Sequence, residues 1–271
     1  MSGTRYAFPK APVTEPNTAP RSGRALLLFA HGTSDGAGAE IADRLAAELS
    51  RKGLFDEVAV CFSLQEPHPA DVIARLSSPQ IFVMPLLACD GRITRDVLPG
   101  LIGLAEERDR SRVTLCQPVG QHPGIARIVA GMASAAADNA GFVPSSTTVL
   151  IAAHGHRYDP TSASAARRLA GQIRANGRWV AVDCVFLSET PTARHWRTVS
   201  ATRDTIVVPY FISGGRHETV DLPAMIQPGE SDASDGRRVV LTAAVGRASQ
   251  LAYLVVDQML ELVRDHVLEL A

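Results

Sequence analysis

Two histidines and a glutamate in the second half of the chain have the chemistry of a metal site. His154 follows the apolar run Val149–Ala153, Glu189 follows a run that ends at Leu187, and His217 lies in a Gly-Gly-Arg-His loop. Two imidazoles and a carboxylate suit a borderline divalent ion such as Co(II), Fe(II), Ni(II) or Zn(II). Histidine can also accept a proton near neutral pH. We predict these three residues as metal ligands and the two histidines as catalytic bases; for Glu189, a surface carboxylate at a helix start is the alternative.

These three residues can form one site only if the strands that precede them lie side by side in a sheet. Each of them follows an apolar run of strand length, and helical patterns separate the runs. Such alternation favours a parallel sheet, and ligands bind beyond the carboxyl ends of parallel strands. We therefore expect the three side chains to meet at one sheet edge.

The chain contains two copies of one unit. The segment 26–32 matches 149–155, since both are apolar runs that end in Ala-His-Gly. The segment 81–99 aligns without gaps with 205–223 and shares the Val-x-Pro strand, the Gly-Arg pair and the final proline. Repeats of this kind indicate duplication.

The predicted fold is therefore α/β, with two tandem flavodoxin-like units, each a parallel sheet flanked by helices, and a cleft between them. We expect a disordered leader over 1–24, a first domain over 25–140 and a second over 147–271, with 135–146 as the boundary. Residues 228–236 are predicted as an acidic, flexible surface loop.

The first copy departs from the second at the metal site. Ile93 aligns with His217, and Val97 aligns with Asp221. Isoleucine can neither ligate a metal nor accept a proton, so we expect the first unit to have lost an independent site. His31 would then face the cleft as a proton shuttle, a secondary metal contact or a relic.

Composition excludes several other functions. The 271 residues carry a net charge of −1, which does not favour nucleic-acid binding. No apolar run approaches the roughly 18 residues of a membrane span, and the N-terminus resembles no secretory signal. The four cysteines form no C-x-x-C pair, which favours buried free thiols in a reducing, cytoplasmic setting.

The motifs of this sequence resemble those of a known family. The Ala-His-Gly strands, the Glu-x-Pro at 189–191 and the Pro-x-Phe-x-x-x-Gly-x-His-x-x-x-Asp-x-Pro stretch at 209–223 look like class II chelatases, namely sirohydrochlorin chelatases of the CbiX/SirB type. The chain resembles the long, duplicated form, with its site in the C-terminal half as in CbiK-like relatives. The resemblance implies ATP-independent insertion of a divalent metal into sirohydrochlorin, for cobalamin or siroheme synthesis. Co(II) is the first candidate, Fe(II) and Ni(II) are possible, and no organic cofactor is needed.

The resemblance also implies roles for residues around the site. His154 and His217 would bind the metal and take up pyrrole protons, and Glu189 would assist. The macrocycle is rich in carboxylates, which arginine binds well, and glycines allow a flat ligand to approach. The predicted substrate-binding residues are His31, Arg92, Arg157, Arg194, Gly214, Gly215 and Arg216. His156 and Tyr158 could contact the macrocycle edge or face solvent.

Two other functions remain open. A degenerate homologue could hold metal or tetrapyrrole without turnover. An unrelated flavodoxin-like or nucleotide-binding protein is weaker, because neither half has a G-x-G-x-x-G loop after its first strand. The expected partner is a small tetrapyrrole, with neither nucleic acid nor membrane. Because a duplicated chain supplies its own pseudo-dimer, we expect a monomer or a weak homodimer.

Overall fold

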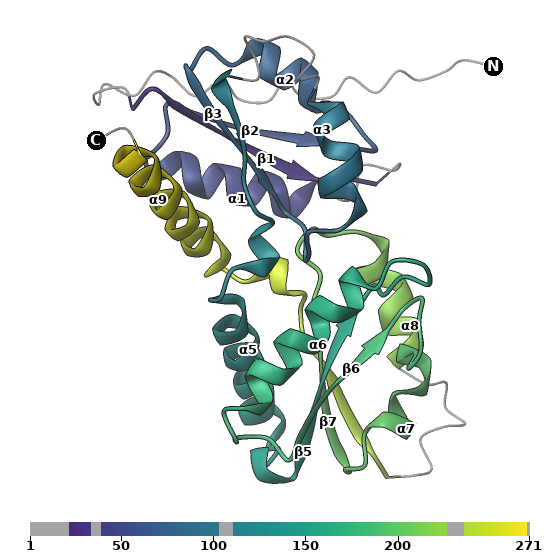
Figure 1. The fold of residues 1–271 in the computed structure, drawn as a ribbon. Coiled ribbons are helices and arrows are strands. Elements are labelled where there is room, and N and C mark those ends of the chain that lie inside the picture. The colour runs from purple at the N-terminus through teal and green to yellow at the C-terminus, as the bar shows by residue number, and fades with distance from the viewer. Residues whose placement is uncertain (1–21, 34–38, 103–110, 227–235, 270–271) are drawn as a thin grey trace, which may run out of the picture.

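The computed structural model describes residues 22–33, 39–102, 111–226 and 236–269, with side chains described through 264. These residues form two α/β units in tandem (Figure 1). The predicted leader lies almost entirely outside the described residues, and so does the predicted acidic loop at 228–236.

Each unit follows the predicted alternation of strands and helices. The elements of the first unit are, in chain order, β1 (Arg24–Ala30), α1 (Glu40–Arg51), β2 (Glu57–Phe62), α2 (Pro69–Arg75), β3 (Gln80–Pro85), the π-helix η1 (Ile93–Val97), α3 (Leu98–Leu101), β4 (Val113–Leu115), the 3-10 helix η2 (Val119–Gln121) and α5 (Ile125–Ala140). A 3-10 turn, η3 (Pro144–Ser146), leads into the second unit. Its elements are β5 (Thr147–Ala153), α6 (Thr161–Arg174), β6 (Ala181–Phe186), the 3-10 helix η4 (Ala193–His195), α7 (Trp196–Val199), β7 (Asp204–Pro209), the π-helix η5 (His217–Asp221), α8 (Leu222–Ile226), β8 (Arg238–Leu241), the 3-10 helix η7 (Val245–Arg247) and α9 (Leu251–Glu269).

The two sheets have equivalent topologies. Their strand orders are β2-β1-β3-β4 and β6-β5-β7-β8, and every pairing is parallel. The central strands β1 and β5 are apolar and almost wholly buried, as expected of strands covered on both faces. The predicted duplication and fold class are confirmed.

The helices bury the faces that their periodicity predicts. Ile41, Leu45 and Leu49 of α1 are buried, as are Leu169 and Ile173 of α6. These residues recur every four positions, so one apolar stripe of each helix packs on the sheet.

The last helix of each unit lies on the other unit. Helix α5 ends the first unit but packs against β7 and α6 of the second, whereas α9 ends the second unit and packs against α1 of the first (Figure 1). In α9, Met259 is buried with its sulfur 3.9 Å from Cys116 Sγ, and Gln258 Nε2 donates to the Gln117 carbonyl at 2.7 Å. One buried apolar cluster consequently contains residues of both sheets, which fixes the two units against each other.

The segment predicted as the boundary is helical over its first part. Helix α5 continues to Ala140 because its apolar face covers the second sheet, and Gly141 then ends it in the left-handed conformation with φ of 65°.

The cysteines are free thiols, as predicted. Cys61, Cys116 and Cys184 are buried and Cys89 is half-buried. Burial raises the pKa of both Cys116 and Cys184 to about 12, so these thiols stay protonated and unreactive. Among the described helices, none is long and apolar enough to cross a bilayer.

Candidate metal and tetrapyrrole site

His154 and His217 come together at the carboxyl edge of the second sheet. His154 directly follows β5, and His217 begins η5 after the neighbouring strand β7. Their ring centroids are 4.8 Å apart, and the ring planes meet at 72°. The register of two adjacent parallel strands therefore places the two predicted ligands side by side.

In both rings, Nδ1 is held by a hydrogen bond to an oxygen of the protein. His217 Nδ1 lies 2.8 Å from Asp221 Oδ2, and His154 Nδ1 lies 2.5 Å from the Gly155 carbonyl oxygen. A carbonyl oxygen and a carboxylate can only accept, so each Nδ1 carries the proton and donates. Each neutral ring thus keeps the lone pair of Nε2 for a metal or a proton.

A third imidazole approaches from the first unit. The Ser63 hydroxyl donates to the His31 carbonyl at 2.9 Å, so Ser63 Oγ accepts the proton of His31 Nδ1 at 2.7 Å. Burial, followed by repulsion from the charged forms of His154 and His217, lowers the pKa of His31. His31 is therefore a mainly neutral ring with a free Nε2 beside the pair.

The glycine loop before η5 contacts the first unit. A Cβ on Gly215 would lie 3.1 Å from the Thr33 methyl group, and one on Gly214 would lie 3.2 Å from Ile41 Cδ1. The φ of Gly215 is 143°, in the region that favours glycine. These two glycines let the loop that carries His217 pack directly on the first unit.

Glu189 is held by protein partners. Arg167 Nη2 donates to Glu189 Oε1 at 2.9 Å, and the backbone N–H of His156 donates to Oε2 at 3.2 Å. Within the described part of the chain, no group of three or more His, Cys, Asp or Glu side chains is arranged to hold a metal ion. The two oxygens of Glu189 instead fix the loop that follows His154.

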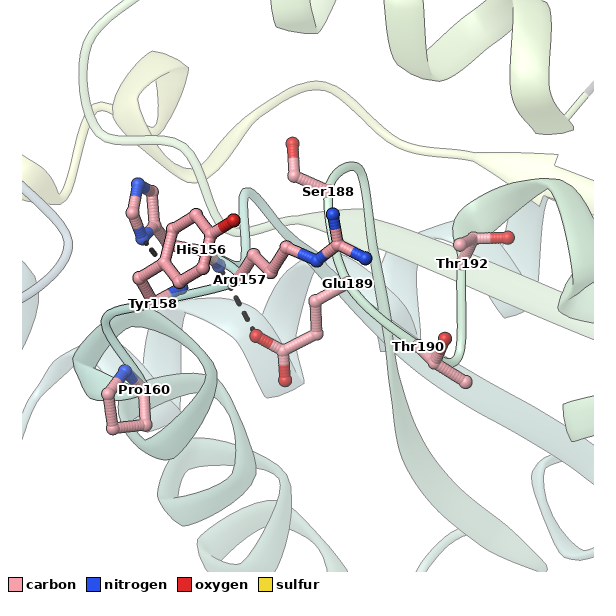
Figure 2. Close-up of a pocket in the computed structure, with 8 residues that line it drawn as sticks. All are labelled: His156, Arg157, Tyr158, Pro160, Ser188, Glu189, Thr190 and Thr192. Carbon is pink, nitrogen blue, oxygen red and sulfur yellow. Dashed lines mark hydrogen bonds between the residues drawn. The ribbon is translucent and has the colours of Figure 1, made fainter.

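That loop forms one wall of a pocket of about 680 Å³ in the second unit (Figure 2). The other wall is the loop after β6. The lining residues are His156, Arg157, Tyr158, Pro160, Ser188, Glu189, Thr190 and Thr192. Of the arginines predicted to bind substrate, Arg157 lines this pocket.

The other predicted arginines lie outside the lining of this pocket. Arg216 is largely exposed and pairs with Asp221 at 3.3 Å, so it shares the carboxylate that orients His217. Arg194 is exposed on η4. Arg92 belongs to the first unit, and its backbone N–H bonds to the carboxylate of Asp159 on the second.

The equivalent position of the first unit has no ligand. Ile93 begins η1, the counterpart of η5, and packs against the apolar core of the first unit. Val97 stands where Asp221 would be. The first unit thus keeps the π-helix without the imidazole or its carboxylate partner.

Glu218 was not predicted from the sequence as a residue of this site. The side chain of Glu218, directly after His217, is only 9% exposed, and its Oε2 has no hydrogen-bond partner. Its Oε1 binds Arg247 at 2.5 Å, and Arg247 also binds Glu40 of the first unit at 3.1 Å. The aligned residue of the first copy, Thr94, is likewise buried with an unpartnered hydroxyl, and only the alignment of the two copies could have singled out this position.

Known proteins resemble this chain in sequence and fold. A probable sirohydrochlorin cobaltochelatase of Halobacterium salinarum is 28% identical over 264 residues, which cover 87% of this chain and 90% of that protein. The structure of DR2241 from Deinococcus radiodurans, a multi-domain protein with structural similarity to chelatases, has a TM-score of 0.72 at 24% identity. This match covers 87% of this chain, which spans only 54% of that protein.

Two solved structures match over nearly their whole length. CbiX, described as the terminal enzyme for siroheme biosynthesis in denitrifying bacteria, has a TM-score of 0.66 at 24% identity, with 87% of this chain and 98% of that chain covered. The sirohydrochlorin chelatase SirB from Bacillus subtilis subspecies spizizenii, in complex with cobalt, has a TM-score of 0.65 at 17% identity, with 87% and 93% covered. At these identities both matches support the fold.

The family model for CbiX matches the chain twice, over residues 25–136 and again over 148–262. The two matches coincide with the two sheets and include both His-Gly motifs. This chain belongs to the CbiX family.

Proposed function

We propose that this protein is a sirohydrochlorin chelatase, which inserts a divalent metal into the tetrapyrrole without ATP. Family membership and the activity given for the Halobacterium relative support the reaction class. The observation that carries the proposal is the His154–His217 pair, in which both Nδ1 atoms donate within the protein and both Nε2 lone pairs are free.

The reaction needs both properties of these rings. The metal enters as a dication while two pyrrole N–H protons leave, so the charge balances. Two imidazole ligands hold a borderline metal without completing its coordination shell, and the ion can pass to four pyrrole nitrogens. A neutral imidazole that has released the metal can accept a pyrrole proton.

Asp221 would assist His217 in both roles. Its carboxylate fixes the ring through Nδ1 and stabilises the imidazolium that forms when Nε2 takes a proton. His31 adds an imidazole from the first unit, near enough to the pair for the charged forms of His154 and His217 to lower its pKa. Glu189 would act on the loop that carries His154 and His156, which is an indirect role in metal insertion.

Cobalt is the metal that we propose. The name of the Halobacterium relative supports cobalt, whereas the CbiX matched in fold is the terminal enzyme of siroheme biosynthesis. Imidazole nitrogens bind both cobalt and iron, so the affinity of the site for each ion does not determine which metal is inserted. Equal concentrations of Co(II), Fe(II) and Ni(II) under anaerobic conditions should yield mainly cobalt sirohydrochlorin in a competition assay.

The direct test is metal insertion by the purified protein. Metal-free sirohydrochlorin and Co(II) are mixed without ATP, and the absorbance change is compared with that of a protein-free control. We expect a rate that is proportional to protein concentration. A rate equal to the spontaneous one, with tight binding of metal or macrocycle, would instead identify a carrier without turnover.

A further inference from the structure

A largely buried ion pair connects the helix that carries His217 to the turn before α9. Glu218, the second residue of η5, accepts from Arg247 Nε at 2.5 Å and from the Ala244 backbone N–H at 3.4 Å, both through Oε1. The other oxygen, Oε2, has no hydrogen-bond partner among the described residues, and the Glu218 side chain is nine-tenths buried. The carboxylate therefore depends on Arg247 for the compensation of its charge.

Arg247 extends this pair to the first unit. Its Nη1 donates to both oxygens of Glu40, at 3.1 and 3.2 Å, and Glu40 is the first residue of α1. Arg44, one turn further along α1, donates to the Gly246 carbonyl at 2.9 Å. The turn η7, which directly precedes α9 (Figure 1), is thus held by the first unit on one side and by η5 on the other. We call this chain of contacts the Glu40–Arg247–Glu218 bridge.

The first unit has the same elements without this ion pair, so the fold itself does not require it. Thr94 of η1 stands at the position of Glu218. Gln121 of η2 stands at the position of Arg247. Replacing a buried ion pair by well-packed apolar residues is often neutral for stability, so a buried pair is weak evidence of a stabilising role. What distinguishes the second unit at this place is the imidazole of His217.

The position of His217 depends on the placement of η5 as a whole. Asp221 orients the ring from within the same helix. The loop before η5 contains two adjacent glycines, which have no side chains to anchor it. The contact of Glu218 with Arg247 therefore ties η5, and with it His217, to a part of the molecule outside this loop.

We propose that the Glu40–Arg247–Glu218 bridge positions His217 for metal binding, and that α1 of the first unit acts on the metal site through it. This inference rests on the proposed function. A functional site requires its side chains to be held within about 0.5 Å of the productive geometry. Glu218 and Arg247 are thus positioning residues, and the first unit contributes to a metal site for which it supplies no ligand at Ile93.

The test replaces the ion pair by its counterparts from the first unit. The double variant Glu218→Thr/Arg247→Gln removes both charges, so neither is left buried without a partner. Glu218→Gln is the conservative variant, because its amide oxygen can still accept from Arg247. Arg247→Lys keeps the charge but replaces the fork that reaches two carboxylates by a single ammonium.

Gln258→Ala is the structural control. It removes a different contact between the units, the hydrogen bond from α9 to the Gln117 carbonyl. Isothermal titration with Co(II) alone measures metal affinity, and insertion assays give kcat and the KM for sirohydrochlorin. All measurements are made at a temperature at which circular dichroism shows every variant to be folded.

We expect the double variant to bind Co(II) about tenfold more weakly and to insert it with a kcat about tenfold lower, since groups that orient metal-binding histidines typically contribute ten- to a hundredfold. The KM for sirohydrochlorin should stay almost unchanged. Arg247→Lys should shift both values in the same direction by a smaller factor, and Glu218→Gln should keep most of the wild-type affinity. Gln258→Ala should lower the melting temperature and leave cobalt affinity and kcat at the wild-type values.

Wild-type cobalt affinity and kcat in the double variant, or in Arg247→Lys if the double variant does not fold, would overturn the positioning role and leave the chelatase activity intact. A loss of cobalt affinity in Gln258→Ala equal to that of the double variant would also overturn it, because the effect would then reflect general stability. A wild-type protein that neither binds Co(II) nor metallates sirohydrochlorin would overturn the proposed function together with the bridge.

Discussion

His217 Nδ1 lies 2.8 Å from Asp221 Oδ2, one turn further along the π-helix η5. The bond occupies Nδ1 and leaves Nε2 free for a ligand. In the first unit neither partner exists, because Ile93 and Val97 occupy these positions. The carboxylate and the imidazole are thus present together in one unit and absent together in the other.

Loss of the Asp221 carboxylate should weaken the metal site. For Asp221→Asn we expect Co(II) affinity and the insertion rate to fall about ten- to a hundredfold, as is typical for partners of metal-binding histidines. Isothermal titration with Co(II) alone and the insertion assay measure the two effects. Asp183→Asn, which removes a surface carboxylate paired with Arg174, is the charge-matched control and should change neither. A normal cobalt affinity in Asp221→Asn would contradict this role.

The protonation of His31 should make stability depend on pH. Its pKa is below 6.5 in the folded protein, mainly because the ring is buried, so the unfolded chain binds this proton at higher pH. The stability that depends on neutral His31 is therefore complete above pH 6.5 and is lost as pH falls from there to the lowered pKa.

The free energy of unfolding, measured with urea across this range, should be less pH-dependent in His31→Gln than in the wild type. The exposed His195 provides the control, and His195→Gln should reproduce the wild-type slope. Parallel curves for wild type and His31→Gln would argue against the burial of a neutral imidazole.

Alanine substitution should change stability in opposite directions at Gly215 and at Gly171. Gly215→Ala places a methyl group 3.1 Å from Thr33 at a φ of 143°, so it should lower stability and displace the loop that carries His217. Gly171 lies inside α6, and a methyl group added there would have no atom within 4 Å apart from its chain neighbours and the backbone of its own helix. Gly171→Ala should therefore raise stability by about 0.5–1 kcal/mol. Urea unfolding and the insertion rate test both; equal stability and activity in the two variants would contradict the packing of this loop.

Each unit should need the other to fold stably, because α5 of the first unit packs on the second and α9 of the second packs on the first. A fragment of residues 22–146 has the first sheet but lacks α9, and a fragment of residues 147–271 lacks α5. Each fragment would expose apolar surface that the other covers, so we expect neither to unfold cooperatively alone and an equimolar mixture to regain a thermal transition. Circular dichroism during heating measures this. Cooperative melting of either fragment by itself would contradict the dependence.

The sequence predicted the relationships that strand order and register determine. Alternating strands and helices implied parallel sheets, and residues that follow adjacent parallel strands had to meet at one edge. The pairing of His154 with His217 follows from this rule, as does the absence of a partner at Ile93. The duplication supported the prediction of the site, because each motif of the second unit could be compared with its copy in the first.

Relationships that depend on side-chain direction or on docking of the units were out of reach. The approach of His31 requires the exchange of α5 and α9, which no local pattern encodes. Glu189 binds Arg167 because of how α6 packs beside the β6 loop. His156 Nδ1 accepts hydrogen bonds from the backbone N–H groups of Tyr158 and Asp159, whose direction is set by the loop conformation.

We propose that the second unit performs metal insertion and that the first unit supports it. Cobalt insertion into sirohydrochlorin is therefore compared between His217→Ala and Ile93→Ala, which truncate aligned positions of the two units. We expect the rate to fall at least about a hundredfold in His217→Ala, as for loss of a general base, and to remain near the wild-type value in Ile93→Ala. Equal rates in the two folded variants would contradict the assignment of the working site to the second unit.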